Sequence, residues 1–105
     1  MGAGSDDASD EPLADRVARL HETLAATEER PVERTAGRWI GEAQAVARDA
    51  VELTDDQGTR EPVIRIRVGH VLDMLENVER TGDATADEHV ATAHALAESI
   101  VNEEN

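Results

Sequence analysis

Histidines and carboxylates are the residues of this sequence that could do chemistry, as metal ligands or as acids and bases. The histidines are His21, His70, His89 and His94. His21 and Glu22 begin the zinc-binding pattern HExxH, but Ala25 stands where its second histidine would be. His89 and His94 are five residues apart, which places them on different parts of a helix surface. A metal site needs three or four convergent ligands, so we expect neither a metal nor a cofactor.

Catalytic patterns have little support. The chain has 24 Asp and Glu, so a pair of carboxylates close in sequence carries no information. No Ser-His-Asp arrangement stands out from chance, and no glycine-rich phosphate loop is present. We therefore expect a protein that is not an enzyme.

Arginines and small residues gather on the side opposite the apolar face when the segment from about Val32 to Leu53, with Arg30 just before it, is drawn as a helix. They are Arg30, Arg34, Gly37, Arg38, Gly41, Ala45 and Arg48. Two exposed helical glycines cost roughly 1 kcal/mol each relative to alanine, whereas arginine can fork onto carboxylate or phosphate. Two interpretations stay open: a contact surface for a partner, or arginines that pair with acids on neighbouring helices.

Trp39, the single aromatic residue, falls within the apolar arc of the same segment, so we expect it in the core. A second apolar stripe follows later in the chain, beside the main stripe of its helix. Its residues are Val63, Ile66, His70 and Met74. Either this helix is the most central one, or the stripe is a seam that packs on a second copy of the chain.

Apolar residues repeat at spacings of three and four in four segments, which predicts helices over about 11–27, 32–53, 61–80 and 86–101. Asp10 could cap the first helix, and Thr85 with Glu88 forms a capping-box pattern before the fourth. Residues 63–68 also alternate with period two, so a short strand is an alternative there.

Short connections between four amphipathic helices predict an all-α fold, an antiparallel up-down four-helix bundle. We expect a single domain over 10–101, preceded by a disordered acidic tail over 1–9.

The charge balance is the strongest compositional signal. The net charge is −14, and all ten basic residues are arginine. At molar salt the Debye length falls to about 3 Å, so self-repulsion is screened. The composition therefore indicates a protein of a salt-rich cytoplasm.

Two long stretches resemble a family of small acidic haloarchaeal proteins whose role is uncharacterised. They are "LHETLAATEERPVERTAGRWIGEAQAVARDA" and "RVGHVLDMLENVERTGDATADEHVATAHALA". The resemblance covers most of residues 13–101 and implies a salt-loving cytoplasmic protein, but it carries over no functional residue.

A non-enzymatic protein-interaction module is the function that these observations favour. We expect its partner to be a protein, and a second copy of the chain in a homodimer is one candidate. The contact would be made either by the arginines and small residues named above or by the stripe of Val63, Ile66, His70 and Met74. The alternative is a nucleic-acid-associated regulator that binds phosphate through the same arginines. The net charge opposes that alternative.

Overall fold

The computed structural model describes residues 12–56 and 60–102, and within them every regular element is an α-helix. The helices are α1 (Leu13–Glu28), α2 (Arg34–Thr54), α3 (Glu61–Leu75) and α4 (Ala84–Asn102). Residues 63–68 lie inside α3, so the helix prediction is confirmed and the strand alternative is wrong. The tail predicted over 1–9 and the cap predicted at Asp10 lie outside the described residues.

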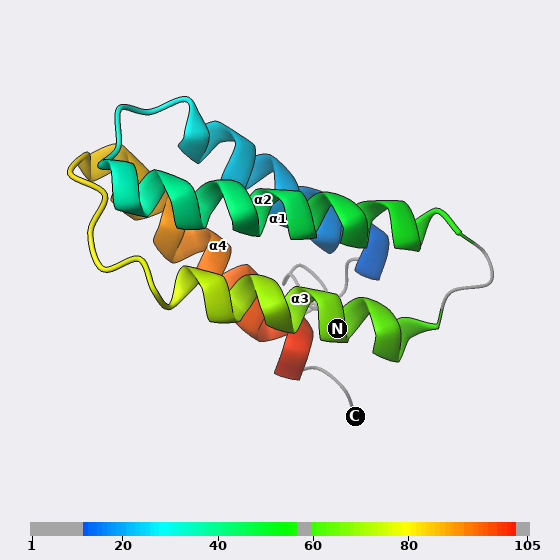
Figure 1. The fold of residues 1–105 in the computed structure, drawn as a ribbon. Coiled ribbons are helices and arrows are strands. Elements are labelled where there is room, and N and C mark those ends of the chain that lie inside the picture. Colours follow the sequence, from blue (N-terminus) through cyan, green and yellow to red (C-terminus); the bar gives the residue numbers. More distant parts are fainter. Residues whose placement is uncertain (1–11, 57–59, 103–105) are drawn as a thin grey trace, which may run out of the picture.

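The four helices pack side by side as expected for a four-helix bundle (Figure 1). α1 lies against α2 and α4, and α3 completes the bundle by contacting the same two helices, more extensively α2 than α4. Both α1 and α2 make more extensive contacts than α3, so α3 is not the most central helix.

Small side chains allow these helices to approach closely. Among the described residues, the buried alanines all come from α2 and α4: Ala36, Ala43, Ala47, Ala50, Ala86, Ala93 and Ala97. The larger fully buried side chains interleave with them, among them Leu20 and Leu24 of α1, Ile40 of α2 and Ile100 of α4. A bundle of this kind fills its core with aliphatic side chains and leaves little room for an aromatic ring.

α3 ends at Leu75, five residues before the predicted end. Beyond it, the Asn77 N–H donates to the Met74 carbonyl at 3.1 Å and the Val78 N–H to the Leu75 carbonyl at 3.0 Å, which is a tighter turn than the α-helix. The Asn77 side chain also donates to the Asp73 carbonyl at 3.1 Å. Asparagine often ends helices by such local bonds to the backbone.

α4 begins two residues earlier than predicted, because Asp83 rather than Thr85 caps it. The Ala86 N–H donates to Asp83 Oδ2 at 2.9 Å, and the Asp87 N–H donates to the Asp83 carbonyl at 2.9 Å. Thr85 lies within the first turn of α4, so the predicted capping box of Thr85 and Glu88 is wrong.

None of the helices within residues 12–56 and 60–102 combines the length and the apolar composition that a bilayer crossing requires.

Candidate functional site

The loop before α2 and the loop before α4 are joined at one end of the bundle. Arg30 forms a two-pronged ion pair with Asp83, with Nε donating to Oδ2 at 3.0 Å and an Nη donating to Oδ1 at 3.2 Å. The Glu33 N–H donates to the Thr81 carbonyl at 2.7 Å. Thr81 is fully buried, and both its N–H and its hydroxyl donate to Asp87 Oδ1 at 2.8 Å. We call these five residues the loop junction.

The carboxylates of Asp83 and Asp87 in the loop junction are held in their ionised form. The hydrogen bonds from Arg30, and then the one from the Ala86 N–H, lower the pKa of Asp83 below its ordinary value. Those from the backbone and hydroxyl of Thr81 lower the pKa of Asp87. A general acid or base near neutral pH needs a shift in the opposite direction, so these groups position loops rather than transfer protons.

The acid sensitivity of the loop junction can be measured with two substitutions at one position. Asp83→Asn keeps a side-chain oxygen that can cap α4 but loses the ion pair, whereas Asp83→Ala loses both. We expect the melting temperature at pH 7 to fall for Asp83→Asn and to fall further for Asp83→Ala. Because the folded pKa of Asp83 is depressed, its contribution is present above about pH 4 and is lost as the pH falls through the folded pKa.

The difference between the parent and Asp83→Asn should therefore vanish in strong acid, as followed by circular dichroism. Asp73→Asn is the matched control, since Asp73 is exposed and has no ion pair among the described residues. A gap between the parent and Asp83→Asn that stays constant from pH 7 to pH 2 would contradict this assignment.

The arginines predicted to form one surface are divided by the structure. Arg30 belongs to the loop junction, which favours internal pairing for that residue. Arg34 and Arg38 are exposed near the start of α2, and Arg38 Nε lies 3.9 Å from Glu42 Oε2. Arg48 is exposed about three turns further along α2.

The glycines of the predicted surface are half-buried rather than an open strip. A Cβ on Gly41 would lie 2.9 Å from Glu28 Oε2 of α1, and a Cβ on Gly37 would lie 3.2 Å from Val32 Cγ2. These positions therefore let α1 and the preceding loop approach α2. Ala45 alone of the three small residues is exposed.

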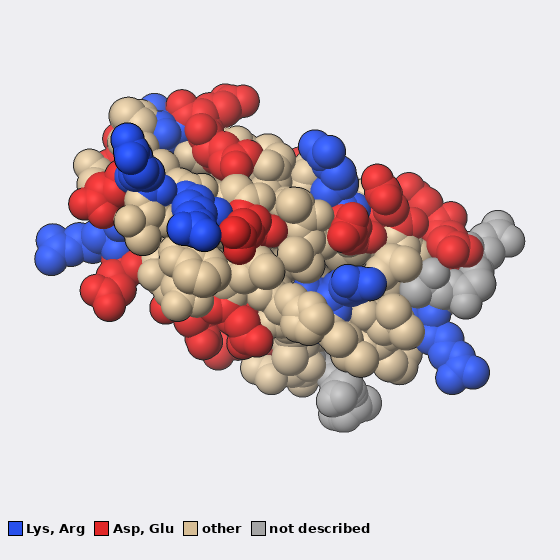
Figure 2. All heavy atoms as spheres, viewed as in Figure 1, with Lys and Arg blue, Asp and Glu red and all other residues tan. Residues whose placement is uncertain are grey.

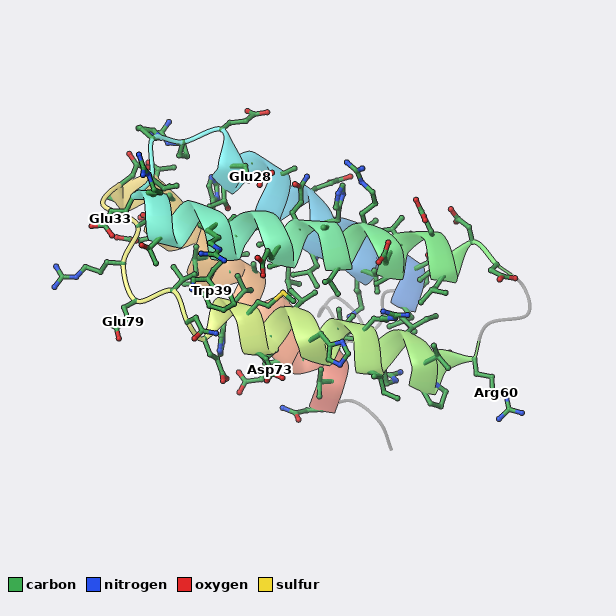
Figure 3. The ribbon with its side chains drawn as sticks, in the orientation of Figure 1. Glu28, Glu33, Trp39, Arg60, Asp73 and Glu79 are labelled. Atoms are coloured by element: carbon green, nitrogen blue, oxygen red, sulfur yellow. The ribbon has the colours of Figure 1, made fainter. Side chains whose placement is uncertain are left out.

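Trp39 is not in the core, so that prediction was wrong. Its side chain is half-buried and lines a hollow of about 340 Å³ together with Arg34, Thr35, Arg38 and Glu42. Figure 3 shows Trp39 projecting from α2 on the side where α3 lies. The core positions of α2 are mostly alanines, and their close packing displaces the indole to the flank of the helix.

The stripe predicted on α3 lies largely at the surface. Val63 is 43% exposed and Ile66 is 60% exposed, and they are the exposed large apolar residues of the described chain. His70 is also exposed, whereas Met74 is half-buried against the core. We call the four stripe residues together with Trp39 the α2–α3 face. Figure 2 shows uncharged surface running between charged side chains on the side of the molecule formed by α2 and α3.

A second hollow, of about 500 Å³, lies between the end of α3 and α4. Its polar lining is mostly acidic, with Glu76, Glu79 and Asp87, and His94 Nε2 lies 3.6 Å from Glu76 Oε2. Within residues 12–56 and 60–102, no group of three histidine or carboxylate side chains is placed to hold a metal ion.

Sequence reasoning missed the loop junction, although "TGDATAD" carried a signal for it. Asp83 directly precedes Ala84, where α4 begins, and aspartate at that position is a capping pattern. Gly82, with φ of 86°, supplies the left-handed turn that brings Thr81 and Asp83 together. Only the folded chain shows that Arg30, 53 positions away, completes it.

Comparisons with known proteins identify a family but no activity. Neither the curated proteins nor the solved structures include a match to this chain. A family model described as "Domain of unknown function (DUF8152)" matches residues 16–105, which include all of α2, α3 and α4 and most of α1. The chain therefore belongs to the family described as Domain of unknown function (DUF8152).

Proposed function

We propose that this chain is a small, non-enzymatic protein-interaction module and that its contact surface is the α2–α3 face. The observation that carries the proposal is the exposure of Val63 and Ile66 on α3, a helix that also carries the half-buried Met74 and packs against α2, which carries the half-buried Trp39. Large apolar side chains grouped at the surface, with charged residues around them, are typical of binding sites for other proteins.

The residue types on this side of the molecule support the same proposal. Tryptophan and arginine are the types that most often dominate the binding energy of protein interfaces. Here Trp39 shares its hollow with Arg34 and Arg38, which are both exposed. The bulk of the indole can bury area against a partner, and the arginines can fork onto its carboxylates.

We further propose that the module works in a salt-rich cytoplasm, as a haloarchaeal protein would. The support is compositional: a net charge of −14 with no lysine.

The antiparallel up-down order of the four helices is also proposed. Its support is that a hollow is lined jointly by residues at the start of α2 and just after the end of α3, including Thr35, Ala36, Val78 and Glu79.

Nucleic-acid binding is the second candidate. An aromatic ring flanked by two arginines could stack on a base and contact phosphate, as Trp39 with Arg34 and Arg38 could do. However, Glu42 lines the same hollow and Glu33 is exposed one residue before α2, which reduces the local positive charge. Protein therefore suits this surface better than a polyanion.

A matched pair of substitutions tests the proposed surface. Ile66→Glu places a carboxylate in the α2–α3 face, and Ala95→Glu places one at an exposed position of α4. The parent and each variant are immobilised and exposed to a host lysate in 2 M KCl. We expect Ala95→Glu to capture the same proteins as the parent, in equal amounts. Capture should fall by about tenfold or more for Ile66→Glu, because burying an unpaired carboxylate is heavily penalised.

Circular dichroism should show the same helix content for all three proteins. If Ile66→Glu captured the same proteins as the parent, the α2–α3 face would not be the contact surface. The second candidate would be favoured instead if the immobilised parent bound nucleic acid, and if this binding was lost when salt was added and in the double variant Arg34→Gln with Arg38→Gln.

A further inference from the structure

We draw no further inference here: the strongest candidate, the exposed apolar patch of Val63 and Ile66 on α3, belongs to the contact surface already proposed, and nothing in the structure shows which partner covers it.

Discussion

Replacing Ile40 with alanine is expected to lower the free energy of unfolding by about 2–5 kcal/mol, the usual cost of truncating a large buried aliphatic side chain. Ile40 is fully buried on α2. The surrounding core contains many alanines, which have no side-chain freedom to fill the space that is left. Urea denaturation followed by circular dichroism measures the change, with the slope of the unfolding free energy against urea unchanged.

Ile66→Ala is the matched control, because it makes the same chemical change at a position that is 60% exposed. It should change stability by less than about 0.5 kcal/mol when measured on dilute, monomeric protein. Equal losses for Ile40→Ala and Ile66→Ala in dilute protein would show that the burial assignment is incorrect.

Salt should have the second large effect. The full chain has a net charge of −14, and its radius of gyration is 13.8 Å. In dilute buffer, at about 0.01 M salt, the Debye length is about 30 Å, so carboxylates across the whole molecule repel one another. We expect the melting temperature to rise by roughly 10 °C or more between this buffer and 0.5 M KCl, or about 2 kcal/mol for a domain of this size.

The shape of the salt dependence separates two causes. Screening is nearly complete at 0.5 M, where the Debye length is about 4 Å. A further rise up to 3 M would come from the salting-out that strengthens apolar burial. The control variant Asp49→Asn with Glu52→Gln and Asp55→Asn removes three exposed carboxylates, and its rise below 0.5 M should be smaller. Identical curves for parent and variant would argue against charge repulsion as the cause.

Trp39 illustrates how local reasoning can misplace a residue. At 100° per residue it falls within the apolar arc of α2, but close to its edge. The arc does not tell how close the neighbouring helices come. Because alanines form most of the centre of that arc, α1 and α3 pack against α2 too closely for an indole to lie between them. Burial of a large side chain depends on the separation of helices, which is a property of the whole bundle.

Helix ends show the same limit. The end of α3 at Leu75 depends on the turn through Asn77 and Val78, whereas the apolar period alone extended it to 80. The start of α4 depends on Asp83, whose carboxylate caps the helix and binds Arg30 at once. A capping residue that also pairs with a second loop is hard to recognise in the sequence, because one of its two partners, here Arg30, lies far away in the chain.

The sequence by itself determined that the chain is helical, how many helices it has, and which side of each faces the core. The 3.6-residue period of apolar side chains is a local property, and four repeats of it leave few other ways to bury those stripes. Even the exposed stripe on α3 was visible, as a second set of apolar residues beside the first.

The tertiary structure decided what the arginines and glycines of α2 do. Arg30 pairs with Asp83 and so does not belong to the predicted surface. Gly41 does not belong to it either, because Glu28 of α1 lies against it. Only the packing of α2 against α3 placed Trp39 on the side of α2 where α3 lies (Figure 3). Periodicity places a residue on a face of its own helix. Which other helix lies against that face depends on contacts between residues far apart in the chain.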